Sequence, residues 1–320
     1  MKKNLSLAVL TVASATSLWA CDLCAVYSAN ESRGELGRGF SAGVAEQFTH
    51  FGTMQQDGQK VPNDAQQHLN SSISQLMVRY NFHEHFGVQF NLPVIHRSFV
   101  RPDGFANDSG TVTGIGEVSL LGRFSVLRDD AQNVTYTWNI LGGVKLPTGD
   151  TRRLHEEVDE LTAPPQPPGA PESGIHGHDL ALGSGSVDGI VGTSIFARYK
   201  HVFLSANAQY AIRTKGDFDY EYANDLTWAG GPGVYLVLEN EWTLAVQLNV
   251  SGEYKPRDTF EGATADDTGV TAVYLGPELS VSWTEKLSAE IGADIPVSIK
   301  NTALQAVVDY RLRAGVTWRF

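Results

Sequence analysis

Apolar and polar residues alternate one by one along much of the chain. From Tyr310 to Phe320 every second residue is apolar, and the residues between them include Arg311, Arg313 and Arg319. A β-strand places such residues on opposite faces, one apolar and one cationic. The same alternation predicts about twelve strands. They are residues 39–51, 69–82, 86–99, 115–127, 133–146, 186–199, 201–213, 226–238, 241–254, 270–283, 287–299 and 305–320.

The connections between these segments fall into two length classes. Those after the even-numbered strands are tight, among them HEH, KH and EN, whereas those after the odd-numbered strands are mostly long and polar, the longest being 147–185. Short turns on one side and long loops on the other are typical of bacterial outer-membrane barrels. A secreted β-sandwich would also alternate, but its strands are shorter and its loops show no such asymmetry. We therefore expect an all-β fold, a transmembrane antiparallel β-barrel over residues 39–320.

The first residues have the features of a secretory signal peptide. Lys2 and Lys3 precede an apolar stretch, and the small residue Ala20 stands at a plausible cleavage point, which predicts a signal peptide over residues 1–20. Residues 21–38 would then form a periplasmic segment with a CxxC motif that could enter the barrel as a plug. After residue 20 no apolar run approaches the roughly 18 residues of a helical membrane span.

Charge and the last aromatic residues indicate partners. The chain has 24 Lys and Arg against 36 Asp and Glu, a net charge of −12, and no basic stripe, which argues against nucleic acid. Trp318 and Phe320 would face lipid in the periplasmic aromatic girdle, and a chain ending there matches the assembly signal of outer-membrane barrels. We expect outer-membrane lipid and the barrel-assembly machinery as partners, and the outer membrane of a Gram-negative bacterium as location.

Two stretches carry a family resemblance. They are GGVKLPTGD (142–150), which closes the fifth predicted strand, and LGSGSVDGIVGTS (182–194), which opens the sixth. Together with the strand plan they resemble the phenol-degradation meta-pathway transporter family of outer-membrane β-barrels. The resemblance covers most of the chain after residue 20. It implies a transporter barrel and says little about its substrate.

If the apolar faces meet lipid, the polar faces point into the lumen. The predicted lumen-lining residues are Arg79, Arg97, Glu117, Arg123, Lys145, Arg213, Glu290, Asp294, Asp309, Arg311 and Arg313. Two interpretations remain open for this mixture of signs. It forms either a network of ion pairs that stiffens a narrow barrel or a constriction that selects small polar or anionic solutes.

Cysteine and histidine residues offer a possible metal site. Cys21 and Cys24 could form a disulfide, bind a soft ion such as copper with His83 or His85 from the same periplasmic side, or, for Cys21, carry a lipid. The motifs HEH (83–85) and GIHGHD (174–179) fall on opposite sides of the membrane. We expect both to be solvent-exposed turns.

One further pair suggests an enzyme. His96 and Ser98 share a strand face, a spacing that resembles outer-membrane phospholipase A, but no third group is evident to orient the histidine. We therefore predict no enzyme and no cofactor, but a porin-like or facilitative transporter of small solutes. The alternatives are a metal-handling or structural outer-membrane protein with a closed pore, and an outer-membrane lipid hydrolase.

Overall fold

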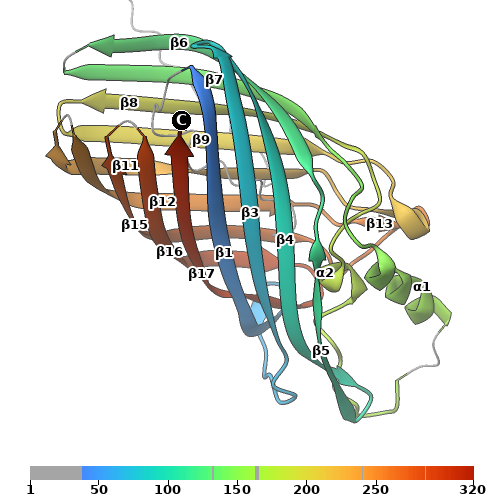
Figure 1. Ribbon diagram of the computed structural model, residues 1–320. Coiled ribbons are helices and arrows are strands. Elements are labelled where there is room, and N and C mark those ends of the chain that lie inside the picture. The colour runs from blue at the N-terminus through green and yellow to red at the C-terminus, as the bar shows by residue number, and fades with distance from the viewer. Residues whose placement is uncertain (1–37, 132, 163–165, 240, 285) are drawn as a thin grey trace, which may run out of the picture.

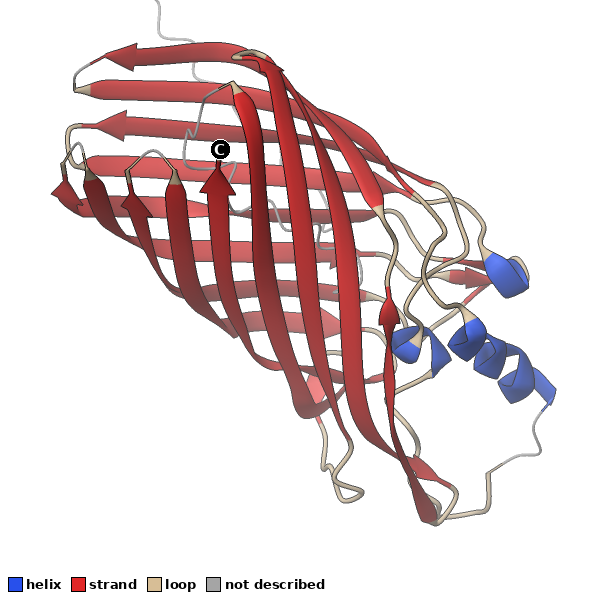
Figure 2. Ribbon diagram, viewed as in Figure 1, coloured by secondary structure: helices blue, strands red, loops and turns tan. Residues whose placement is uncertain are grey.

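The chain forms a long barrel whose strands run obliquely around a central axis (Figures 1 and 2). The computed structural model describes residues 38–131, 133–162, 166–239, 241–284 and 286–320. The predicted signal peptide and the segment 21–38, apart from Arg38, lie outside these residues, as do Cys21 and Cys24.

Twelve strands form the barrel wall, as the alternation predicts. They are β1 (Gly39–Gln56), β3 (His68–His83), β4 (Phe86–Asp103), β6 (Ser119–Ala131), β7 (Val134–Lys145), β8 (Asp188–Tyr199), β9 (Val202–Ile212), β11 (Asp225–Leu238), β12 (Trp242–Lys255), β15 (Val270–Trp283), β16 (Leu287–Asn301) and β17 (Leu304–Arg319). Each is antiparallel to the next, and β17 returns to pair with β1, from Ser41↔Arg319 to Gln56↔Leu304. This pairing closes the sheet into a barrel, the form that strands take in lipid.

The remaining elements gather at the end of the barrel that carries the long connections (Figure 1). They are β2 (Gln59–Lys60), β5 (Ala106–Ile115), η3 (Arg152–Leu154), α1 (His155–Thr162), α2 (Gly177–Leu180), η4 (Asp217–Asp219) and the small sheet of β10 (Tyr220–Glu221), β13 (Thr259–Phe260) and β14 (Ala263–Thr264). No helix in the described ranges is long and apolar enough to cross a membrane. We call this end the outer end and the end with the tight turns the periplasmic end.

The outer surface of the wall is apolar. In β17, Leu312 and Val316 are 48% and 50% exposed. Arg311, on the opposite face of the same strand, is only 8% exposed. The same alternation gives exposed Ile291 in β16 and Val44 in β1. An apolar outer belt on a closed antiparallel barrel is the pattern of an outer-membrane protein of a Gram-negative bacterium.

The interior is not uniformly polar, and the prediction of a polar inner face is incomplete. Phe196, Phe203 and Ala245 form a buried apolar cluster in the lumen near the periplasmic end. The rings of Phe196 and Phe203 lie 5.5 Å apart. Inward-facing apolar residues are stable here because they pack against one another rather than against water.

The wall divides between β16 and β17 in its outer half. Their register pairs run from Leu287↔Trp318 to Asp294↔Arg311 and end there. Beyond this point β16 continues along β15 and β17 continues along β1. A hollow of about 410 Å³ lies at the division, between 295–299 of β16 and 307–309 of β17. The backbone of β17 bonds inward instead, since the Ala306 N–H donates to the carbonyl of Gly174 at 2.8 Å.

Candidate functional site

The longest connection, residues 146–187, folds back over the outer mouth of the barrel (Figure 1). We call it the mouth loop. Its two ends meet at the base, where the Leu182 N–H donates to the Asp150 carbonyl at 3.0 Å. Gly149 and Gly183 cross there so closely that a Cβ on Gly149 would lie 2.7 Å from the Gly183 Cα. The two sequence stretches that carry the family resemblance are therefore in contact, and both need glycine at the crossing.

Apolar side chains anchor the mouth loop inside the barrel. Ile175 and Leu180, from the α2 region, are fully buried against Leu69 of β3 and Phe99 of β4. Burial of a side chain of this size stabilises a structure by roughly 1.5–3 kcal/mol, as an upper estimate. The loop is thus packed as a core element and not as a solvated surface segment.

Charged groups of the wall hold the same loop. Arg101 of β4 bonds to Glu156 at 2.8 Å. Glu117, in the connection between β5 and β6, accepts hydrogen bonds from the Ser184 N–H at 2.7 Å and from its hydroxyl at 2.6 Å. Charged partners strengthen such hydrogen bonds, so these contacts fix the position of the loop.

His178 of GIHGHD is buried and His176 is half-buried, so the expectation of an exposed turn is wrong for this motif. His178 is 3% exposed, with Nδ1 2.9 Å from Glu157 Oε1 and Nε2 3.5 Å from Asp179 Oδ1. His176 lies against it with nearly parallel rings, and its nitrogens are 3.5 Å from Glu160 and 3.4 Å from Asp267. These carboxylates come mostly from α1 and a distant loop, which the sequence pattern does not reveal.

Neighbouring carboxylates favour the charged forms of His176 and His178. Burial alone would lower the pKa of His178, but Asp179 and Glu157 outweigh it, and the pKa lies well above the ordinary value of 6.5. Burial likewise opposes ionisation of Glu157, yet His178 lowers the pKa of that carboxyl to about 2. His178 and Glu157 therefore each favour the charged form of the other.

Of the predicted metal ligands only His83 and His85 lie within the described part of the chain, so the copper site with Cys21 and Cys24 stays a prediction. No group of three or more His, Cys, Asp or Glu side chains there is placed to hold a metal ion. His83 and His85 lie stacked in the exposed β3–β4 turn, with His85 Nδ1 3.0 Å from the carbonyl of Ser125. This turn is at the periplasmic end, opposite His176 and His178, as the sequence predicts.

One group of predicted lumen residues forms an ion-pair chain at the outer rim. Lys145 bonds to Glu117 and lies 2.9 Å from Asp188. The chain of ion pairs continues with Arg213, which lies 2.7 Å from Asp188 and 2.6 Å from Asp225. The chain links β7, β8 and β11, and through Glu117 it reaches the mouth loop.

A second group lies deeper, on the opposite wall. Arg313 bonds to Asp294 at 2.9 Å and to Glu278 at 3.2 Å, and Arg311 lies 3.3 Å from Glu253. These pairs join β12, β15, β16 and β17. Within this second group, each buried charge has an opposite charge beside it, which offsets the cost of burial.

The other predicted lumen residues are dispersed. Arg79 bonds to Gln89 at 3.0 Å, and Glu290 is 7% exposed. Arg123 lies 3.1 Å from Asn81 Oδ1. Asp309 differs from the others, because it borders the hollow between β16 and β17 and accepts from Thr53 at 2.6 Å.

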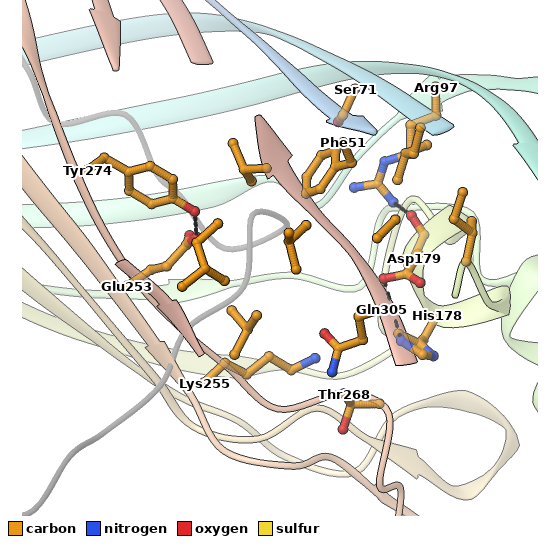
Figure 3. Close-up of a pocket in the computed structure, with 17 residues that line it drawn as sticks. Phe51, Ser71, Arg97, His178, Asp179, Glu253, Lys255, Thr268, Tyr274 and Gln305 are labelled. Carbon is orange, nitrogen blue, oxygen red and sulfur yellow. Dashed lines mark hydrogen bonds and ion pairs between the residues drawn. The ribbon is translucent and has the colours of Figure 1, made fainter. Parts of the chain in front are cut away.

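A cavity of about 80 Å³ lies inside the barrel beneath the mouth loop (Figure 3). Arg97, Ser71 and Phe51 lie on one side of it, and Lys255 and Thr268 on the other. The aromatic and aliphatic part of the lining was not apparent from the sequence, because Phe51 sits at a register shift in β1 that breaks the alternation.

His96 and Ser98 have separate partners. His96 Nδ1 lies 2.6 Å from Thr113 Oγ1, and Ser98 Oγ accepts from Asn70 at 3.2 Å. A hydrolase needs the histidine to activate the serine directly. This geometry does not favour the hydrolase alternative.

Comparison with known proteins identifies the fold. No family model matches the chain, and no curated protein matches it. The COG4313 outer membrane channel from Pseudomonas putida F1 is similar in structure, with a TM-score of 0.61 and 15% sequence identity over 89% of this chain and 97% of that one. The translocator domain of the autotransporter NalP from Neisseria meningitidis is more distant, with a TM-score of 0.41 and 13% identity over 89% of each chain. The chain thus has the fold of an outer-membrane β-barrel.

Proposed function

We propose that this protein is a facilitative channel for small solutes in the outer membrane, with the mouth loop as its gate. The observation that carries the proposal is the mouth loop itself, which is packed inside the barrel over a cavity lined by charged and apolar groups. A barrel of twelve strands is wider than the filled eight-stranded type and narrower than a sixteen-stranded porin. A folded-in loop is a means of controlling such a lumen.

Two further points support a channel. The similar Pseudomonas putida structure is an outer membrane channel. The sequence resemblance to the phenol-degradation meta-pathway transporter family points to the same class. We infer the transport function from these two similarities. The class of solute is inferred from the chemistry of the cavity.

The division between β16 and β17 favours a second exit. Ile299, Val307 and Val308 line both the inner cavity and the hollow in the wall. Only these side chains are shared by the two spaces within the described residues. A solute with an apolar part could therefore leave the cavity toward the membrane as well as along the lumen.

Conductance in planar bilayers tests the proposal. In one variant a short Gly-Ser linker replaces residues 152–180, because Asp150 and Leu182 already meet at the base of the loop. We expect this variant to close as a barrel and to open more often or with larger current than the wild type. A control variant shortens the tip of the β4–β5 hairpin at 103–106, outside the mouth loop, and should behave as the wild type.

The result also separates the alternatives. Equal currents from the wild type and the loop variant would refute the mouth loop as gate. No current from either would favour a structural barrel with a closed pore.

A further inference from the structure

Arg97 is a buried cation whose bonds go to neutral groups. It is 2% exposed, and its Nη1 donates to the carbonyls of Asp179 and, at 2.9 Å, of Ala181. Its Nε is buried without a hydrogen-bond partner among the described residues, and no carboxylate there lies within ion-pair distance. Four other buried cations lie 2.6 to 3.3 Å from a carboxylate oxygen: Lys145, Arg213, Lys255 and Arg311.

Two hydroxyls continue the row of donors beside Arg97. Ser71 of β3 is the register partner of Arg97, and Thr49 of β1 is the register partner of Ser71. Both hydroxyl oxygens are buried and, within the described residues, make no hydrogen bond. Three neighbouring strands thus present a guanidinium and two hydroxyls side by side, at strand spacings of about 4.8 Å.

Such groups are costly unless a ligand satisfies them. Burying a polar group without a partner destabilises a structure, and burying a charged group without one does so more strongly. Ser71 and Arg97 line the cavity beneath the mouth loop, and the guanidinium points into it (Figure 3). A guanidinium and hydroxyls together match an anion that accepts several hydrogen bonds, and a carboxylate fits the planar fork of arginine.

The rest of the cavity limits the kind of anion. The carboxylates that line it are already engaged, Glu253 with Tyr274 and Arg311, and Asp179 with His178 and the His176 N–H. Apolar side chains supply much of the remaining lining, among them Phe51, Leu69, Ile299, Val307 and Val308. Lys255 and His178 also line the cavity but already have carboxylate partners, so Arg97 beside the apolar wall suits a single negative charge with an apolar part.

The size of the cavity limits the apolar part. Its volume of about 80 Å³ is well below the roughly 150 Å³ of a protein cavity that holds benzene. A carboxylate with a short aliphatic chain fits this space, whereas a dianion would leave one charge without a partner.

We propose that the cavity binds a small aliphatic monocarboxylate, with its carboxylate on Arg97 and Ser71 and its chain against Phe51 and Leu69. As a statement of what the barrel carries, this rests on the proposed channel function. As a binding site, it stands on Arg97, Ser71 and the cavity alone.

Calorimetric titration of the purified full chain in detergent tests the site, with butyrate as the probe. We expect butyrate to bind, butylamine and 1-butanol to give no saturable heat, and formate to bind more weakly than butyrate. Arg97→Gln should weaken butyrate binding roughly tenfold or more, the effect of losing a charged hydrogen-bond partner. Arg198→Gln is the matched control, since Arg198 lies outside the cavity and bonds to Thr135 near the periplasmic end.

Because Arg97 also holds the mouth loop, a second variant separates binding from loop docking. Ser71→Ala leaves the loop contacts described above in place and should still weaken butyrate binding roughly tenfold. Heat-modifiable migration on gels confirms that each variant has closed as a barrel. Undiminished butyrate binding by both closed variants would overturn the site, and equal binding of butyrate and formate would overturn the apolar subsite.

Flux distinguishes this inference from the channel proposal. Liposome swelling is measured with a neutral sugar and with butyrate. Flux of either solute without saturable butyrate binding would refute the site and keep the channel. Butyrate binding that depends on Arg97, with no flux of either solute, would keep the site and refute the channel.

Discussion

His178 of the mouth loop lies with Nδ1 2.9 Å from Oε1 of Glu157, both of them buried. The pair joins α2 to α1 and so links the part of the loop inside the barrel to the part above it. Glu160, Asp179 and Asp267 surround it with further negative charge, His176 adds a second imidazole, and the ring of Tyr220 stacks on His178. This arrangement couples loop position to protonation.

The first prediction concerns pH. The pKa of His178 is raised in the folded loop, so its stabilisation is complete below about pH 6.5 and is lost as pH rises through the raised pKa. The pKa of Glu157 is lowered, so its stabilisation is complete above about pH 4.5 and is lost as pH falls toward 2. We expect the loop to dock most firmly between these limits and to loosen at alkaline pH.

Limited proteolysis of the mouth loop across pH 5 to 10 measures this loosening. Glu157→Gln should shift the onset to lower pH, because the histidine loses one of its carboxylates. His155→Asn is the matched control, since His155 pairs with Asp159 on the exposed side of α1. A cleavage rate that does not depend on pH in the wild type would contradict the prediction.

The second prediction concerns the anchor between Glu117 and Ser184. Glu117→Gln removes a charged acceptor from the Ser184 N–H and should lower the free energy of local opening by about 1.5–3 kcal/mol. Hydrogen exchange of the Ser184 amide reports this directly. Glu84→Gln, in the exposed periplasmic turn, should leave that amide unchanged. If the Ser184 amide exchanges equally in both variants, Glu117 does not anchor the loop.

The third prediction concerns the phase of the closing strand. Leu312 is exposed on the outer face, whereas Arg311 is buried beside Glu253. Leu312→Cys should react with a membrane-confined thiol probe, and Arg311→Cys should not. Placing arginine on the lipid face costs about 2–4 kcal/mol near the bilayer midplane, so Leu312→Arg should destabilise the barrel by a similar amount. Labelling at 311 in preference to 312 would reverse the assignment of the two faces.

The fourth prediction concerns the aromatic pair at the seam between β1 and β17. The rings of Phe40 and Phe320 lie 5.2 Å apart, and the Phe320 N–H donates to the Phe40 carbonyl at 3.0 Å. We infer that Phe320, with Trp318, is read by the barrel-assembly machinery. Phe320→Ala should lower the amount of heat-modifiable barrel in the outer membrane more than Arg319→Ala does. Equal amounts would leave the aromatic pair without an assembly role.

The fifth prediction concerns the divided wall. Because β16 and β17 share no register pairs beyond Asp294↔Arg311, the amides of 295–301 that face β17 lack a strand partner. They should exchange hydrogen faster than the amides of 288–292, which are paired on both sides. Uniform protection along β16 would mean that the wall is closed in solution.

The alternation of residues was enough to predict the strands and their phase. A strand buries alternate residues in the lumen and exposes the others to lipid, so a period of two appears in the sequence wherever the wall exists. Leu312 and Arg311 are one example, and the confirmed strand order of the barrel follows from the same pattern. Loop lengths then distinguished the two ends.

The sequence could not reveal what depends on contacts between distant segments. His178 reads as an exposed turn residue until Glu157 and Asp267 are placed beside it. Arg97 resembles Lys145, Arg213 and Arg311 until the structure shows that these three have carboxylate partners and that the bonds of Arg97 go to carbonyls. Beyond the division at Asp294 and Arg311, β17 bonds to the mouth loop, and the residues of β17 alternate whether or not β16 lies beside them. Local pattern therefore fixes which face a residue occupies, whereas the partner across the lumen is decided only when the barrel closes and the mouth loop packs inside it.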